Sequence, residues 1–160
     1  MSYRITGLCA DPFRPLYGLS AAALAAHGVT RVTADHKPGF PDRVELRDAD
    51  PGETLLLLNY THQPAHNAYH ASHAIFVREW AEAAYDRVRE IPPVMRERPM
   101  SLRAFNMQNV MIEAELGAGA ELESLIQHLL ARSDVEYIQA HYAKRGCYAA
   151  RITRAETPAG

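Results

Sequence analysis

The stretch that decides the fold is TLLLLNYTHQPAHNAYHASHAIFVRE, residues 54–79. TLLLLNY (54–60) is a near-continuous apolar run, which is typical of a strand buried on both faces. AIFVRE (74–79) has the same character and predicts a partner strand. The segment that joins them carries His62, His66, His70 and His73, four of the chain's eight histidines. The same stretch therefore predicts a strand pair and raises the question of a functional site.

The flanking sequence predicts more strands than helices. Ser20 is a good N-cap for the helix formers AAALAA, and Gly28 ends that helix. Asp50-Pro51-Gly52-Glu53 predicts a type II turn before the leucine run. Further strands are expected over 29–35, 101–106, 110–116, 135–142 and 147–153, and further helices over 80–89 and 120–132.

Several of these strands are joined too tightly for parallel crossovers. VEYIQAHY and CYAARIT, for example, flank the four residues 143–146, where Gly146 suits a positive φ. In 110–116 we expect Ile112 and Leu116 on a core face and Glu113 and Glu115 on a wetter face. The sequence predicts one α+β domain over residues 1–160, with a mainly antiparallel sheet and helices packed on one side.

Composition narrows the class of partner. The net charge of −2 gives no basic footprint for nucleic acid or anionic lipid. The longest apolar runs, AAALAA and LLLL, are far shorter than the roughly 20 residues of a membrane span. The N-terminus has no apolar core of signal-peptide length. With two cysteines, Cys9 and Cys147, far apart in sequence, we expect a cytoplasmic protein with free thiols.

The histidine segment invites a metal-site interpretation. On a helix, the four histidines would lie within one stripe, and imidazole is a common zinc ligand. Pro64 and Asn67 instead favour a loop between two strands, and residues 61–77 contain no aspartate or glutamate. We therefore predict a solvated loop with one or two structured histidines, no metal and no cofactor, and keep a metal-binding role as an alternative.

Cys147 and three arginines offer other chemistry. Lys144 and Arg145 precede Cys147, and neighbouring cations favour the thiolate form of a cysteine. His141, on the other arm of the expected hairpin, would complete a cysteine–histidine pair; a small buried hydrophobe is the structural alternative. Arginines 78, 103 and 151 fall inside expected strands, where an arginine can bind a carboxylate or phosphate or form a salt bridge with Glu113 or Glu115.

Two long blocks carry a resemblance to a known family. HKPGFPDRVELRDADPGETLLLLNYTHQPAHNAYHASHAIFVRE (36–79) and HYAKRGCYAARITRA (141–155) resemble the bacterial family catalogued as domain of unknown function 1203. The family pattern has cysteine where this chain has Asp42, so a function that needs thiols at 42 and 147 is lost or altered here. The resemblance matches these positions: Gly39, Pro41, Arg43, Gly52, His62, Tyr69, Ser72, His73, Arg78, Gly146 and Cys147.

These observations define a candidate ligand site but no established reaction. We expect a small polar or anionic molecule in a pocket lined by His62, Tyr69, His73, Arg78, His141 and Cys147. If AIFVRE and CYAARIT belong to one sheet, at least two of His73, Arg78, His141 and Cys147 should line one cavity. Catalytic residues stay unassigned, although His73 or His141 would serve as an acid or base. The alternative is a homodimeric interaction module without a small-molecule site.

Overall fold

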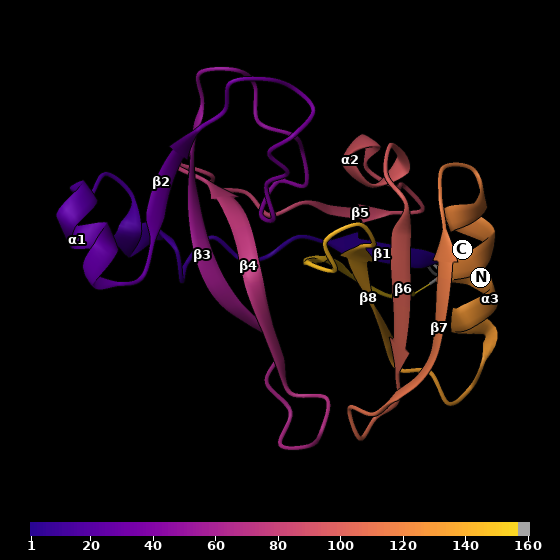
Figure 1. Cartoon of the computed structure of the whole chain (residues 1–160). Coiled ribbons are helices and arrows are strands. Elements are labelled where there is room, and N and C mark those ends of the chain that lie inside the picture. Colours follow the sequence, from indigo (N-terminus) through magenta and orange to yellow (C-terminus); the bar gives the residue numbers. More distant parts are fainter. Residues whose placement is uncertain (157–160) are drawn as a thin grey trace.

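The computed structural model describes residues 1–156 and contains two antiparallel sheets rather than one (Figure 1). The larger sheet has the strand order β5-β1-β9-β8-β6-β7, and the smaller has the order β2-β3-β4. The strands are β1 (Tyr3–Thr6), β2 (Thr30–Thr33), β3 (Thr54–Gln63), β4 (Ala71–Arg78), β5 (Asp86–Val88), β6 (Met100–Phe105), β7 (Met111–Gly117), β8 (Tyr137–Tyr142) and β9 (Tyr148–Arg154). The helical elements are η1 (Arg14–Leu16), α1 (Ala21–Ala26), α2 (Pro93–Arg96) and α3 (Glu121–Ala131).

The expected pair around the histidine segment is confirmed. β3 and β4 pair antiparallel, with Leu56 opposite Val77 and Tyr60 opposite His73. Both strands run further into the histidine segment than expected, so His62 lies in β3 and His73 in β4. Only residues 64–70 remain as the connecting loop.

The expectation of helices packed on one side of a single sheet is not confirmed. Leu122, Ile126 and Leu129 of α3 pack in the core behind the six-stranded sheet. Leu24 of α1 packs instead in a second cluster with Leu56 of the three-stranded sheet. In Figure 1, α1 and α3 lie at opposite ends of the molecule, with the two sheets between them. The fold is therefore sheet-dominated, and α1 and α3 each pack against a different sheet.

Residues 80–89 are not a helix. Trp80 has φ +73, and Asp86–Val88 form β5, which pairs with β1. The apolar spacing of this segment resembles a helix, but hydrogen bonds to the edge of β1 outweigh that local preference. β1 itself was not predicted, because four residues with two buried side chains give little periodicity. The prediction that Leu116 lies on a core face is also wrong, because its side chain is 70% exposed on the edge strand β7.

Other local predictions are confirmed. The Ser20 side chain accepts a hydrogen bond from the Ala23 backbone N–H at the start of α1. Gly52 and Gly146 have φ values of +94 and +78, as the two turns require. In the part of the chain that the structure describes, no helix has the length and apolarity to cross a membrane.

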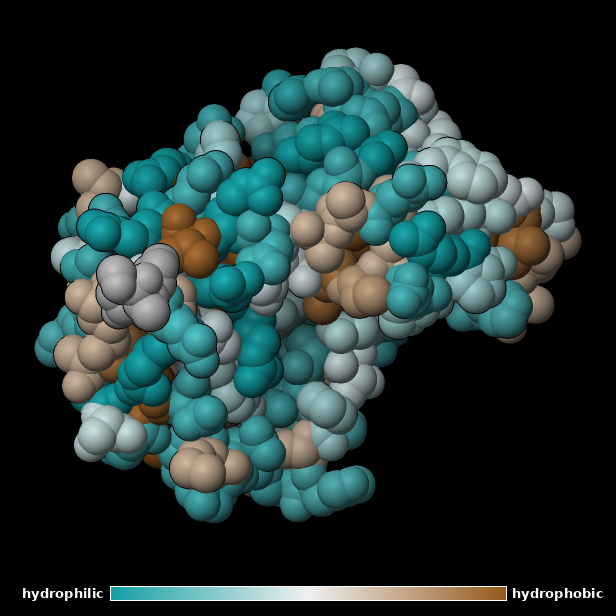
Figure 2. All heavy atoms as spheres, turned by 180° about the vertical axis from the view of Figure 1, so that it is seen from behind, coloured by the Kyte–Doolittle hydropathy of each residue, from teal (hydrophilic) through white to brown (hydrophobic). Residues whose placement is uncertain are grey.

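The surface seen from behind gives no large apolar face. It is mainly hydrophilic, and its hydrophobic residues lie in separate patches (Figure 2). The outline is notched between the end that carries α1 and the rest of the molecule. A functional site is therefore more readily expected among the buried side chains between the two sheets than on this surface.

Candidate functional site

Two of the expected site residues meet between the sheets. The imidazole of His62, in β3, lies 4.9 Å from that of His141, in β8, measured between ring centroids. His62 Nδ1 donates to Gln139 Oε1 at 2.9 Å, and His62 also stacks on Tyr148. His141 is fully buried, and its Nδ1 donates to the Gly146 carbonyl at 3.0 Å. We name His62, Gln139, His141 and Tyr148 the imidazole cluster.

The environment of the imidazole cluster disfavours positive charge. Burial lowers the pKa of His141 to about 3, with a further contribution from the positive charge of Arg103. Burial also lowers the pKa of His62 from its ordinary 6.5. The cluster therefore holds neutral imidazoles at neutral pH. Gln139 and His141 are both almost completely buried.

The other expected residues lie outside this cluster. Tyr69 is exposed in the loop and contacts Phe105 edge-on. His73 is partly buried, and its Nδ1 donates to the Ala74 carbonyl at 2.8 Å. Arg78 forms ion pairs with Glu45 and Glu53, so its guanidinium has a structural role.

The expected pairing of His141 with Cys147 is wrong. A bulge between Ala140 and His141 places Tyr148 opposite His141. Cys147 then faces the core behind the sheet with Tyr142, while His141 faces the three-stranded sheet. β4 and β9 belong to different sheets, contrary to the expectation that both are strands of one sheet. Of the four residues His73, Arg78, His141 and Cys147, Cys147 alone lines either cavity described below.

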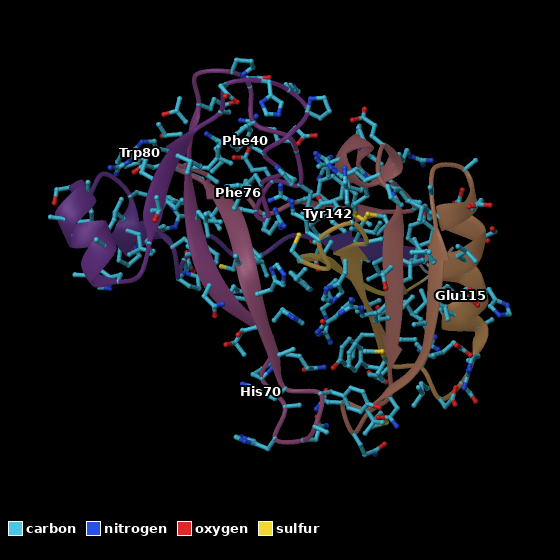
Figure 3. All side chains as sticks on the ribbon, in the orientation of Figure 1. Phe40, His70, Phe76, Trp80, Glu115 and Tyr142 are labelled. Atoms are coloured by element: carbon cyan, nitrogen blue, oxygen red, sulfur yellow. The ribbon has the colours of Figure 1, made fainter. Side chains whose placement is uncertain are left out.

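Cys147 lies in a different cavity, of about 390 Å³, which is rich in cations. We name it the basic pocket. It is formed by the loop before β3, by Phe76 of β4, by the segment after α2 and by the β8–β9 turn. Figure 3 shows Phe76 and Tyr142 on opposite sides of this region. Its lining residues are Pro38, Gly39, Pro41, Arg43, Phe76, Arg98, Pro99, Tyr142, Lys144, Arg145 and Cys147.

Arg43 is the most unusual residue of the basic pocket. It is 1% exposed, yet it forms no ion pair with a carboxylate of residues 1–156. Its Nε donates to the Tyr148 carbonyl at 2.7 Å, its Nη1 donates to the Pro41 carbonyl, and its Nη2 donates to Cys147 Sγ at 3.1 Å. A buried charge ordinarily needs a countercharge as well as hydrogen bonds. This guanidinium therefore gives the pocket an uncompensated positive charge.

Tyr142 adds an unused donor to the same pocket. Two guanidinium groups lie over its ring, with Arg43 Cζ 4.9 Å and Arg98 Cζ 5.3 Å from the ring centroid. The side chain is 5% exposed, and its hydroxyl has no hydrogen-bond partner within the described residues. Burial raises the pKa of Tyr142 to about 12, so the hydroxyl keeps its proton at neutral pH. It is thus a buried donor without an acceptor among residues 1–156.

The remaining cations of the basic pocket differ in whether a carboxylate neutralises their charge. Arg98 is paired with the buried carboxylate of Asp48 at 2.6 Å. Lys144 and Arg145 are exposed at the β8–β9 turn and form no ion pair among residues 1–156. The basic pocket therefore carries a net positive charge, although the whole chain is slightly negative.

Asp42, which stands where the resembled family has cysteine, has a structural role. Its Oδ1 accepts the Arg78 backbone N–H at 2.7 Å, and its Oδ2 accepts the Glu45 backbone N–H. These hydrogen bonds join the loop before β3 to strand β4. Burial raises the pKa of Asp42. Cys147 is thus a free thiol here, as is the exposed Cys9.

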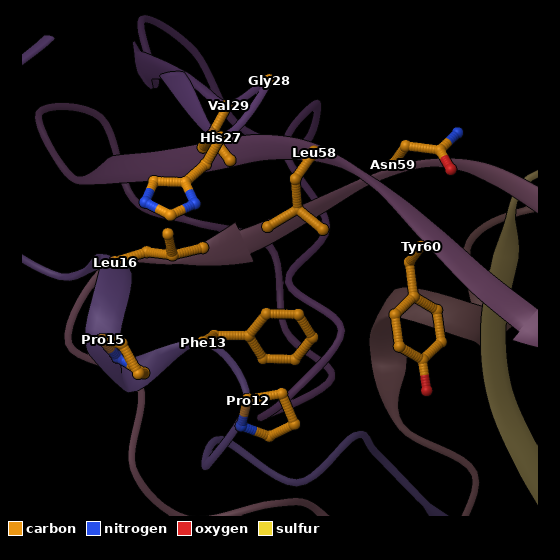
Figure 4. Close-up of a pocket in the computed structure, with 10 residues that line it drawn as sticks. All are labelled: Pro12, Phe13, Pro15, Leu16, His27, Gly28, Val29, Leu58, Asn59 and Tyr60. Atoms are coloured by element: carbon orange, nitrogen blue, oxygen red, sulfur yellow. The ribbon is translucent and has the colours of Figure 1, made fainter. Parts of the chain in front are cut away.

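A second cavity, of about 480 Å³, is mainly apolar (Figure 4). Phe13, Leu16 and Leu58 face into it, and His27 and Tyr60 lie at its sides. It contains no arginine, lysine, aspartate or glutamate. Its lining gives few directional contacts, so it identifies a ligand class less well than the basic pocket does.

We predict that the purified protein carries only substoichiometric zinc, nickel or copper after chelator treatment and dialysis. His66 and His70 are exposed in the loop, and the ring of His62 is engaged with Gln139. No group of three or more candidate metal ligands is close enough to hold an ion within residues 1–156. Elemental analysis measures this. Stoichiometric metal that is lost on replacing His66 and His70 with alanine would contradict the prediction.

Sequence reasoning missed the grouping of Arg43, Arg98 and Tyr142. Arg43 is among the positions matched by the family resemblance, but its sequence neighbours do not indicate that it contacts Cys147, 104 residues away. Arg98 follows a short proline-bounded turn, and no sequence pattern around it indicates a functional role. Tyr142 was expected in a strand, but its contacts with two guanidinium groups depend on the tertiary fold.

Comparison with known proteins gives a family without an assigned activity. The family model described as "Protein of unknown function (DUF1203)" matches residues 39–154. The search of curated proteins and the search of solved structures gave no significant match.

Proposed function

Because the chain belongs to the DUF1203 family of proteins of unknown function, we propose its function from its own geometry. The protein binds a small anionic molecule in the basic pocket. The observation that carries this proposal is Arg43, a fully buried guanidinium whose described hydrogen-bond partners are two carbonyls and a thiol. An anion in the pocket would supply the missing countercharge.

Three further features support an anionic ligand. The Tyr142 hydroxyl offers a donor that has no acceptor within residues 1–156. Lys144 and Arg145 at the pocket's edge attract negative charge from solution. Positions that carry the family resemblance, Pro41 and Cys147 among them, also line this pocket.

The pocket's opposite wall limits the shape of the ligand. Phe76 and three prolines provide apolar surface, and the volume of about 390 Å³ suits a small molecule. We infer a ligand with one anionic group and a compact apolar body. Catalysis is not part of this proposal. The two free thiols also fit a reducing compartment, so we place this binding function in the cytoplasm.

We predict that small anions raise the melting temperature of the protein. A ligand present at about ten times its dissociation constant stabilises by about 1.4 kcal/mol. In a chain of this size, that raises the melting temperature by about 3–5 °C. Phosphate, pyrophosphate and a series of small carboxylates are compared with chloride at equal ionic strength by differential scanning fluorimetry.

Paired charge-removal variants test where the anion binds. Lys144→Gln with Arg145→Gln removes two exposed cations from the pocket, whereas Arg87→Gln with Arg89→Gln removes two exposed cations from the β5 region. The first pair should reduce the shift by at least half, and the second should leave it unchanged. Equal losses, or no shift with any anion, would refute the proposal. A melting temperature that instead rises with protein concentration would favour the homodimer alternative.

A further inference from the structure

Cys147 has the surroundings of a reacting thiol. Its sulfur accepts a hydrogen bond from Arg43 Nη2 at 3.1 Å, and a guanidinium can only donate. The thiolate is the nucleophilic form of cysteine, and an adjacent cation stabilises the negative charge on its sulfur. Cys147 is 8% exposed but lines the basic pocket, so a molecule in the pocket can reach it.

The nearby carboxylates are engaged elsewhere. Asp48 is paired with Arg98, and Asp42 accepts backbone N–H groups of Glu45 and Arg78. Among the described hydrogen-bond partners of Arg43, the Cys147 thiol is the only nucleophilic side-chain group, since the other two are backbone carbonyls. Within residues 1–156, the fold therefore places its one fully buried arginine against a thiol whose nucleophilic form is negative.

A second, independent feature points to an occupant beside the sulfur. Tyr142 lines the same pocket, and its buried hydroxyl has no hydrogen-bond partner within the described chain. Tyr142 and Cys147 are cross-strand neighbours, since the Tyr142 backbone N–H donates to the Cys147 carbonyl at 2.9 Å. An oxygen atom held by this hydroxyl would lie within the same cavity as Sγ.

We propose that Cys147 is a nucleophile for small carboxylate-bearing electrophiles that bind in the basic pocket. This inference rests on the proposed anion-binding function and adds a covalent step to it. With an α-halocarboxylate, the sulfur attacks the α-carbon, an S–C bond forms and the carbon–halogen bond breaks. The halide leaves with the bonding electron pair, and the thiol proton passes to water. The product is a thioether that carries the carboxylate.

The test compares iodoacetate with neutral iodoacetamide on the reduced native protein. Exposed Cys9 is an internal control, because it meets the same reagents without the basic pocket. Peptide mass spectrometry follows the alkylation rate at each cysteine. The ratio of the iodoacetate rate to the iodoacetamide rate should be roughly tenfold higher at Cys147 than at Cys9, because a cationic cleft raises the local concentration of an anion.

Two pairs of variants make the result specific. The ratio at Cys147 should fall towards that of Cys9 in Lys144→Gln with Arg145→Gln, and should not change in Arg87→Gln with Arg89→Gln. Both pairs replace exposed residues, so folding is not at risk. Equal ratios at the two cysteines, or alkylation of Cys147 only after unfolding, would overturn the proposal.

A separate measurement distinguishes failure of this inference from failure of the proposed function. Cys147→Ser removes the nucleophile but keeps the pocket's cations. If anions still raise the melting temperature of wild type and Cys147→Ser while Cys147 of the wild type shows no preference for iodoacetate, the nucleophile proposal is refuted and anion binding stands. If neither anion stabilisation nor preferential alkylation is observed, both proposals are refuted.

Discussion

Replacing Arg43 with alanine is expected to reduce the free energy of unfolding by about 3 kcal/mol or more. The substitution leaves the carbonyls of Pro41 and Tyr148 without their described side-chain donor. It also removes the guanidinium that packs over the Tyr142 ring and creates a cavity at a position that is 1% exposed. Urea unfolding followed by circular dichroism measures the change.

Two further variants separate the causes of this loss. Arg43→Met fills much of the space but donates no hydrogen bonds, and we expect it to remain strongly destabilised. Arg43→Lys keeps the charge, but an ammonium cannot reproduce the planar fork of donors, so it should recover only part of the loss. Arg87→Ala, on the exposed strand β5, is the control and should change stability by less than about 0.5 kcal/mol. A fully stable Arg43→Met protein would show that the fold does not depend on these hydrogen bonds.

Arg43 also connects stability to ligand binding. Its hydrogen bonds hold the loop before β3 against the start of β9, and the basic pocket lies between these segments. An anion that compensates Arg43 should stabilise this junction together with the pocket. The same residue thus positions two walls of the site and supplies its least compensated charge.

Local sequence patterns predicted the elements whose hydrogen bonds are local. The Ser20 cap, the Gly146 turn and the leucine run of β3 all follow from neighbours in sequence. The stripe of α3 is similarly clear, since Leu122, Ile126 and Leu129 are completely buried. Each of these patterns lies within about a dozen residues of sequence, and the tertiary contacts agree with it.

The parts that were missed depend on partners distant in the chain. β5 exists because Asp86–Val88 pair with β1, whose paired residues lie 80 to 84 positions earlier. The bulge between Ala140 and His141 decides which face Cys147 takes, and no residue type in HYAKRGCY marks it. Because side chains alternate along a strand, this one-residue irregularity separates His141 from Cys147. The candidate site therefore contained the right cysteine but the wrong neighbours.

The imidazole cluster predicts a pH dependence of stability. The pKa of His141 is about 3 in the folded protein, because burial and the charge of Arg103 disfavour the imidazolium, against an ordinary 6.5 in the unfolded chain. Between these values the unfolded chain binds a proton that the folded protein does not. The stability that neutral His141 contributes is therefore fully present above pH 6.5, and it is lost as the pH falls below that value. At pH 5, this one residue costs about 2 kcal/mol relative to pH 7.5.

Comparison of wild type with His141→Gln isolates this effect. The free energy of unfolding of the variant at pH 7.5 does not affect the test, because the prediction concerns how the difference between the two proteins changes with pH. That difference should shift by about 2 kcal/mol in favour of the variant on going from pH 7.5 to pH 5, since glutamine does not titrate. Urea unfolding at both pH values measures it. His128→Gln, on the exposed side of α3, is the control and should show no such shift. An unchanged difference for His141→Gln would mean that His141 is protonated inside the fold, with its charge held by the Gly146 carbonyl and Gln139 Oε1 that its two ring nitrogens contact.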